Sequence, residues 1–264
     1  MKPKVLVLGG YGLNCDYETY HSFKLAGGDP EYVHINELIF GKKKLSDYHI
    51  LAVIGGFSYG DDIGAGKVLA NKLRYNLWDD LKQFIDDGKL IIGICNGFQA
   101  IVKSNILPAL NGYDKQTVTL TFNDSGKFED RWINLKANPN TNCIWTKGIE
   151  VIPLPVRHGE GKFVSDKETI AQLEKNNQVV FKYCTKNGQI ANGKYPDNPN
   201  GAINDIAGIC DPSGKVFGIM PHPEAFNHIT NHPNWTALND KSNQEGMGVQ
   251  MFRNAVEYAK ENLL

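Results

Sequence analysis

The feature that most constrains the fold is a short apolar segment that ends in a cysteine between two glycines. Residues 90–99 read LIIGICNGFQ, with Cys95 two residues after Gly93 and two before Gly97. The apolar run predicts a buried strand, and a helical pattern begins directly after it. A sharp strand-to-helix turn crowds the backbone, and glycines relieve the crowding while the side chain at the turn stays accessible. The segment predicts a nucleophile elbow; the alternative is an inert core cysteine.

The elbow is part of a pattern in which apolar strands alternate with helices. Near-continuous apolar strands separated by helices are typical of a mostly parallel sheet that helices cover on both faces. Strands are predicted at residues 4–8, 32–35, 50–54 and 90–94, and helices at residues 17–26, 66–87 and 96–103.

The second half of the chain has a different character. Residues 118–180 are rich in Thr, Asn and aromatic residues, which favours antiparallel strands added to the parallel core. A closing helix is predicted from the apolar positions Val249, Phe252, Val256 and Ala259. At 264 residues the chain is long enough for one large α/β domain, so a single domain over residues 1–264 is predicted.

A second apolar strand far downstream ends in a histidine and a carboxylate. Residues 216–224 read VFGIMPHPE, so His222 stands two residues before Glu224. Each proline biases its predecessor toward the extended region, and residues two apart in an extended chain lie on one side. His222 and Glu224 are therefore expected to be neighbours, with the carboxylate fixing the tautomer of the imidazole. Together with Cys95 they could form a triad; the alternative is a surface turn.

A cysteine nucleophile needs activation, because a free thiol with a pKa of about 8.5 is mostly protonated at neutral pH. The positive end of the helix after Cys95 and a His222 imidazolium held by Glu224 are the two expected sources. Attack on a carbonyl also needs donors for the developing oxyanion. A second strand entering glycines, LAVIGGF at residues 51–57, is expected to emerge at the same sheet edge as Cys95. The predicted oxyanion and substrate residues are Gly56, Phe57, Asn96 and Gln99, the last with a structural role as the alternative.

The amino-acid composition argues against several classes of function. The 28 Lys and Arg residues nearly balance the 29 Asp and Glu residues, which argues against nucleic acid or an anionic membrane as the main partner. No apolar run reaches transmembrane length, and residues 1–8 read as a first strand and not as a signal peptide. The five cysteines are scattered and odd in number, which favours reduced thiols and the cytoplasm.

Two tempting signals do not predict a bound metal or nucleotide. Residues 64–68 read GAGKV, but the glycine and the hydroxyl that a phosphate loop needs are missing. His222, His228 and His232 lie close together, and histidines four residues apart on a helix can bind zinc. Prolines interrupt this segment, however, and no fourth ligand is evident. We therefore predict no metal site and no cofactor in this chain.

Several separated motifs occur along most of the chain. They are NCD at 14–16, GGFSYGDD at 55–62, GICNGFQ at 93–99, NDSGKFEDRW at 123–132, HGEG at 158–161, NPNG at 198–201 and PHPE at 221–224. In this order they resemble the class I glutamine amidotransferases, and among them the glutaminase subunits of phosphoribosylformylglycinamidine synthase. Three positions depart from the family pattern, Leu13, Asp130 and Ala225, and they concern the periphery more than the triad.

The resemblance implies a flavodoxin-like amidotransferase fold and a glutaminase reaction. Cys95 is expected to form a glutamyl thioester, with His222 protonating the ammonia that leaves. The ammonia is then expected to pass to a large synthetase subunit, with a small third subunit in many relatives. That partner is expected to hold ATP and magnesium and to convert formylglycinamide ribonucleotide to formylglycinamidine ribonucleotide. The family likeness leaves His158 and Glu160 as either a second acid–base pair or a tight turn.

Two other classes of function stay open at this stage. A cysteine hydrolase or deglycase on a flavodoxin-like scaffold also uses an elbow cysteine, but its histidine typically follows that cysteine directly, where Asn96 stands here. An inactive amidotransferase-like binding subunit is the non-enzymatic alternative. Loss of Cys, His or Glu would favour it, and all three residue types are present.

Overall fold

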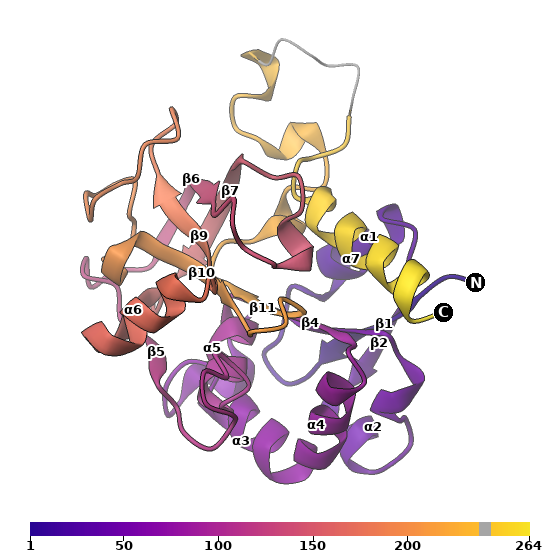
Figure 1. Cartoon of the computed structure of the whole chain (residues 1–264). Coiled ribbons are helices and arrows are strands. Elements are labelled where there is room, and N and C mark those ends of the chain that lie inside the picture. The colour runs from indigo at the N-terminus through magenta and orange to yellow at the C-terminus, as the bar shows by residue number, and fades with distance from the viewer. Residues whose placement is uncertain (238–243) are drawn as a thin grey trace.

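The central feature of the fold is a nine-stranded sheet whose first half is parallel (Figure 1). A computed structural model describes residues 1–237 and 244–264. Four of the parallel strands are almost fully buried, as expected for a sheet covered on both faces, and the edge strand β2 is partly exposed. In spatial order they are β2 (Asp29–His34), β1 (Lys4–Gly9), β3 (Ile50–Val53), β4 (Leu90–Ile94) and β11 (Val216–Ile219).

Helices cover both faces of this parallel half. Helices α1 (Asp16–Leu25) and α7 (Val249–Asn262) lie together on one face (Figure 1). Helices α3 (Lys67–Asn76), α4 (Trp78–Asp86) and α5 (Asn96–Lys103) lie on the other. The predicted α/β architecture with a mostly parallel sheet is therefore confirmed.

The rest of the sheet is antiparallel and curls back over the end of the parallel half. Strand β10 pairs with β11, and the order continues through β9 and β6 to the edge strand β7. The carbonyl of Pro155 in β7 accepts a hydrogen bond from the amide of His222 (2.9 Å), so the edge strand lies beside the segment that follows β11. The bounds are β6 (Glu129–Ala137), β7 (Val151–His158), β9 (Val179–Cys184) and β10 (Ile206–Cys210).

Several smaller elements complete the fold. Strands β5 (Val118–Thr121) and β8 (Lys162–Ser165) form a separate two-stranded sheet, which extends the expected antiparallel region. Helix α2 (Ile35–Ile39) follows β2, and α6 (Lys167–Lys175) follows β8. The sequence analysis did not predict α2 or α6, although Asp166 gives α6 a recognisable start, because its carboxylate accepts from the Thr169 amide (2.8 Å).

One predicted helix is wrong in its extent. The helix expected over residues 66–87 is two helices, α3 and α4, which meet at Leu77. Leu77 has φ −129° and ψ 12°, outside the helical region, and its side chain is buried. Asp79 and Asp80 then occupy the first turn of α4, where carboxylates stabilise the positive end of a helix.

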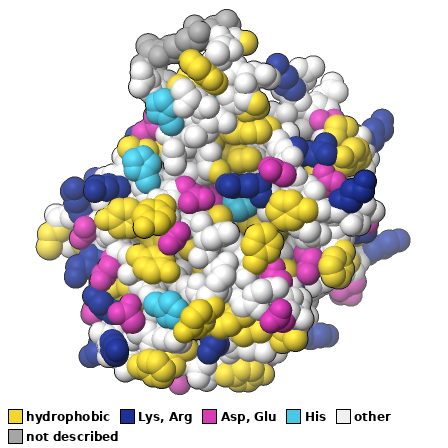
Figure 2. All heavy atoms as spheres, turned by 180° about the vertical axis from the view of Figure 1, so that it is seen from behind, with side chains coloured by type: hydrophobic (Ala, Val, Ile, Leu, Met, Phe, Trp, Pro, Cys, Tyr) yellow, Lys and Arg dark blue, Asp and Glu magenta, His cyan; other side chains and the backbone are white. Residues whose placement is uncertain are grey.

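One face of the molecule carries charged side chains of both signs (Figure 2). Figure 2 shows basic and acidic side chains interspersed over one face, in keeping with the net charge of −1. None of the described helices is both long and apolar enough to cross a membrane.

The contact between α1 and α7 ties the two ends of the chain together. Phe23 and Phe252 are both fully buried, with ring centroids 4.8 Å apart in an edge-to-face arrangement. Aromatic pairs of this geometry contribute beyond their buried area.

Replacing Phe252 with alanine should test how much this contact stabilises the protein. We expect a loss of about 3–5 kcal/mol in the free energy of unfolding, because a large cavity replaces a fully buried ring. The measurement is chemical denaturation followed by circular dichroism. Tyr75→Ala on α3, where the side chain is 81% exposed, is the matched control and should change stability by less than about 0.5 kcal/mol. Equal effects of the two substitutions would contradict the prediction.

Candidate active site

Cys95 occupies a strained turn between β4 and α5, as the elbow prediction requires. Its backbone has φ 50° and ψ −107°, a combination that costs a residue with a side chain on the order of 1–3 kcal/mol. Its amide donates to the carbonyl of Ile219 at the end of β11 (2.8 Å). A Cβ at Gly97 would stand 1.8 Å from the carbonyl oxygen of Val53, so only glycine permits this approach of α5 to β3.

The Cys95 side chain lines a small cavity. It is 5% exposed, and its thiol donates to the carbonyl oxygen of Arg157 in β7 (3.6 Å). The cavity has a volume of about 190 Å³, which is small beside the roughly 300–1,000 Å³ of sites for drug-sized ligands. Its lining comprises Gly56, Phe57, Asp61, Ala65, Cys95, Gln99, Phe122, Phe128, Arg157, His158, Gly159 and Glu160.

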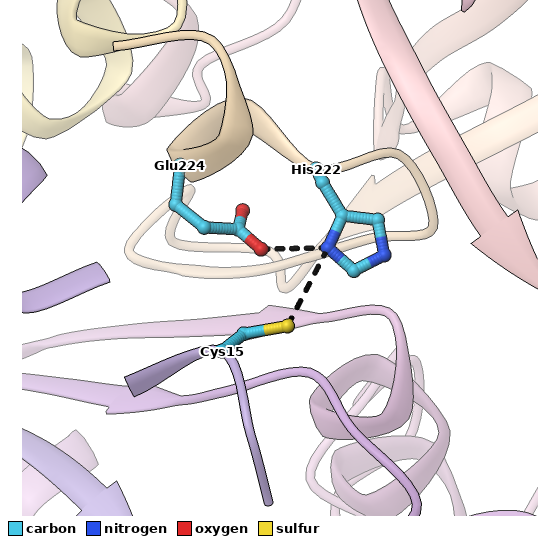
Figure 3. Close-up of side chains that lie close together, drawn as sticks. All are labelled: Cys15, His222 and Glu224. Atoms are coloured by element: carbon cyan, nitrogen blue, oxygen red, sulfur yellow. Dashed lines mark hydrogen bonds and ion pairs between the residues drawn. The ribbon is translucent and has the colours of Figure 1, made fainter. Parts of the chain in front are cut away.

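His222 and Glu224 form a buried pair beside the end of β11. The Nδ1 atom of His222 lies 2.6 Å from Oε1 of Glu224, and both side chains are almost completely buried (Figure 3). The expected proximity is confirmed, but the expected extended backbone through Glu224 is wrong. His222 is extended, whereas Pro223–Ala225 forms a 3₁₀ turn that brings the carboxylate back to the ring.

The charges around His222 favour its protonated form. Burial by itself lowers the pKa of His222, but the charges of Glu224 and Cys95 and the contact with Cys15 raise it well above its ordinary value. Nδ1 faces Glu224, and the buried Nε2 has no hydrogen-bond partner among the described residues. This nitrogen can therefore exchange a proton with a group in the site.

A second cysteine lies against the same imidazole, and sequence reasoning missed its place there. The sulfur of Cys15 is 4.0 Å from Nδ1 of His222, the same nitrogen that Glu224 contacts (Figure 3). Burial raises the pKa of Cys15 to about 11, so it stays a neutral thiol at physiological pH. Cys15 belonged to a motif that carried the family likeness, but nothing local in the sequence shows that it contacts a histidine 207 positions away.

Only some of the backbone amides predicted to stabilise the oxyanion are free to donate a hydrogen bond to a substrate. The amide of Phe57 donates to the carbonyl of Gly12 (2.8 Å), so it is already paired and this part of the expectation needs correction. The amides of Gly56 and Asn96 have no acceptor within the described residues. These two amides, from the ends of β3 and β4, remain the candidates for an oxyanion site near Cys95.

The side chains of Asn96 and Gln99 form a buried network under the cavity. The Asn96 amide group donates to Asp61 (3.0 Å) and Gln99 (2.9 Å), and its oxygen accepts from the Ser58 amide (3.1 Å). Gln99 in turn donates to the carbonyl of Glu160 (2.7 Å). This network fixes the cavity floor, and it gives Gln99 the structural role that was the alternative to substrate binding, although Gln99 also lines the cavity.

His158 joins three loops and is not placed for acid–base work. Its Nδ1 is 3.1 Å from Oδ1 of Asn123, and its Nε2 is 3.4 Å from Nδ2 of Asn200. Burial and the nearby charge of His222 lower the pKa of His158 to about 3, so the ring is neutral at physiological pH. The Glu160 carboxylate accepts from the Ala65 amide (3.4 Å). Of the two readings left open for the 158–161 motif, the structural one fits these contacts.

The metal reading of the three histidines does not fit the structure. His228 bonds to Thr230 (2.7 Å), and His232 accepts from the amide of Asn234 (3.2 Å), so both serve local turns. Within residues 1–237 and 244–264, the ligand-type cluster that does occur consists of Cys15, His222 and Glu224.

Comparison with known proteins agrees with this geometry. The model of the CobB/CobQ-like glutamine amidotransferase domain matches residues 2–259. The chain belongs to this family. A Methanococcus maripaludis protein named phosphoribosylformylglycinamidine synthase subunit PurQ is 47% identical over 97% of both chains. A Dehalococcoides mccartyi protein of the same name is 49% identical over 98% of this chain and 99% of its own length.

Solved structures support the same family fold. A chain in the structure of PurLQS from Thermotoga maritima superposes with a TM-score of 0.73 at 30% identity, covering 98% of this chain and 99% of that one. A glutamine amidotransferase from Thermotoga maritima shares the fold with a TM-score of 0.52 at 14% identity, covering 99% and 93%. The resemblance to the class I glutamine amidotransferases is therefore confirmed.

Glu224→Gln should lower the pKa of His222 in this amidotransferase. A neutral amide keeps the shape of the carboxylate but removes the nearest negative charge that stabilises the imidazolium. The titration of the His222 ring, followed by NMR, should therefore move to lower pH by about one unit or more. A His222→Gln variant assigns the resonance, and Glu257→Gln on the exposed face of α7 is the control. An unchanged midpoint in Glu224→Gln would refute this account of the site.

Proposed function

We propose that this chain is the glutaminase subunit of a phosphoribosylformylglycinamidine synthase. The observation that carries the proposal is the buried His222–Glu224 pair beside the strained turn that presents Cys95. Full-length relatives named as this subunit support the choice of substrate and pathway. The family match over residues 2–259 and the sheet that runs from β2 to β7 support one amidotransferase domain over residues 1–264.

In the first half-reaction the Cys95 thiolate attacks the side-chain carbonyl carbon of glutamine. The charge that develops on the carbonyl oxygen is stabilised by the amides of Gly56 and Asn96. The His222 imidazolium, stabilised by Glu224, then gives its proton to the leaving nitrogen as the C–N bond breaks. Ammonia leaves, and a glutamyl thioester on Cys95 remains.

In the second half-reaction water replaces ammonia. The now neutral His222 takes a proton from water, and the oxygen adds to the thioester carbonyl. Breaking the C–S bond releases glutamate and restores the Cys95 thiolate beside the protonated imidazole. The sum of the two halves is glutamine plus water to glutamate plus ammonia.

The ammonia is proposed to pass to a separate synthetase subunit. This proposal is supported by the similar chain from Thermotoga maritima, whose structure is described as that of PurLQS. We place the ATP and magnesium for amidine formation on that subunit and none on this chain, and a small third subunit completes the proposed complex. The five unpaired cysteines support a reducing compartment, the cytoplasm, as the place of action.

Cys95→Ala tests the proposed nucleophile. Glutamine-dependent synthesis by the assembled complex should fall by several orders of magnitude, because no thioester can form, while ammonia-dependent synthesis should survive. The measurement compares the two nitrogen sources in one preparation. Cys184→Ala, a buried cysteine of β9, is the matched control and should keep glutamine-dependent synthesis. Full glutamine-dependent turnover in Cys95→Ala would overturn the proposal.

Covalent labelling gives an independent test. A glutamine-like diazoketone should add once per chain, and peptide mass spectrometry should place the adduct on Cys95. Cys15 should stay unlabelled, because burial keeps it a neutral thiol. Labelling at Cys15, or equally at several cysteines, would count against Cys95 as the nucleophile.

A further inference from the structure

One charged side chain in the cavity has no role in the reaction just described. Arg157 lies in the edge strand β7, one residue before His158, and it lines the same cavity as Cys95. Its carbonyl oxygen accepts from the Cys95 thiol (3.6 Å), so this residue lies directly beside the proposed nucleophile.

The guanidinium of Arg157 presents a buried edge with no acceptor. Its Nε and Nη2 atoms are both inaccessible to solvent and have no hydrogen-bond partner among the described residues. These two nitrogens hold parallel N–H bonds on one side of the planar group, which is the arrangement that binds both oxygens of a carboxylate. Because arginine stays charged at all relevant pH values, a buried edge without an anion is costly.

None of the acidic residues that lie opposite Arg157 or line its cavity forms an ion pair with it in the described part of the chain. Asp130 stands opposite Arg157 on β6 but is exposed, and the two form no ion pair within 4.0 Å in the described part of the chain. In the cavity, Asp61 accepts from Gly66 (3.1 Å) and from the Asn96 side chain. Glu160 accepts from the Ala65 amide and lies 4.0 Å from the Lys103 ammonium. Among the described residues, Nε and Nη2 of Arg157 therefore have no acceptor, and this edge is available to an anionic ligand.

The geometry points to Arg157 as the residue that binds the α-carboxylate of glutamine. This inference rests on the proposed function, and it adds the group that selects a free amino acid over other amides. A cavity of about 190 Å³ suits a ligand of amino-acid size, with Cys95 at one side for the carboxamide. Asp61 and Glu160 line the same cavity, so residues of both charge signs surround it, as suits a zwitterion.

Arg157→Met and Arg157→Lys in the assembled complex test the inference. Methionine removes the charge but keeps much of the stem, and lysine keeps a charge without the parallel pair of N–H groups. Steady-state glutamine hydrolysis should show KM raised roughly 10–100-fold in Arg157→Met, the range for a charged hydrogen-bonded pair, and raised less in Arg157→Lys. The change should fall mainly on KM, because the α-carboxylate is bound alike before and during reaction.

A second test of the inference changes the substrate and not the protein. 4-Aminobutanamide is glutamine without its α-carboxylate. The wild-type complex should hydrolyse it with a kcat/KM roughly 10–100-fold below that of glutamine, and Arg157→Met should lose most of this preference. This loss of discrimination is a readout that a merely structural role for Arg157 would not produce, and the wild-type comparison holds even where a variant folds poorly.

Controls separate the possible failures. Arg74→Met on α3, where the guanidinium stacks 3.8 Å from the Trp78 ring centroid, should leave the KM for glutamine unchanged. If the wild-type complex does not hydrolyse glutamine, the proposed function fails. If it does, but KM and amide preference are unchanged in Arg157→Met, only the inference about Arg157 fails. Weakened assembly with an unchanged KM would also overturn it, because it would assign Arg157 to a carboxylate of the synthetase subunit.

Discussion

The strained backbone of Cys95 is the constraint on which the rest of the site depends. A side chain at φ 50° persists only where the surrounding packing over-determines it. Here β4 and β11 hold the residue through the bond from its amide to Ile219, and α5 approaches β3 so closely that Gly97 leaves no room for a Cβ. The parallel half of the sheet thus determines where the thiol points.

The antiparallel half determines where the imidazole lies. The His222 amide is bonded to Pro155 on the edge strand β7, and the same strand supplies the carbonyl that meets the Cys95 thiol. From the other side, Ser22 of α1 donates to the Glu224 carbonyl (3.5 Å). Segments from the beginning, middle and end of the chain are therefore needed to hold one histidine, and the added strands are part of the site rather than an appendage.

Sequence reasoning was most successful where the determining forces are local. The apolar run and glycines around Cys95 specified the elbow, and α5 has the bounds that its pattern predicted. Features set by contacts between distant segments were not accessible in this way. The contact of Cys15 with His222, the pairing of Phe57 with Gly12 and the buried edge of Arg157 all depend on which distant segments the fold brings together. The 3₁₀ turn at Glu224 shows the same limit, because proline spacing alone favoured an extended chain.

The two buried histidines show how the surroundings give similar groups different tasks. His158 has only amide partners, so burial and the charge of His222 lower its pKa and keep the ring neutral. His222 is equally buried, yet Glu224 raises its pKa by supplying the negative charge that an imidazolium needs. Two imidazolium ions side by side would repel each other, so a neutral His158 also protects the charge on His222. The site can therefore hold its proton on the ring that lies beside Cys95, and the other ring is left to join the loops that form the cavity wall.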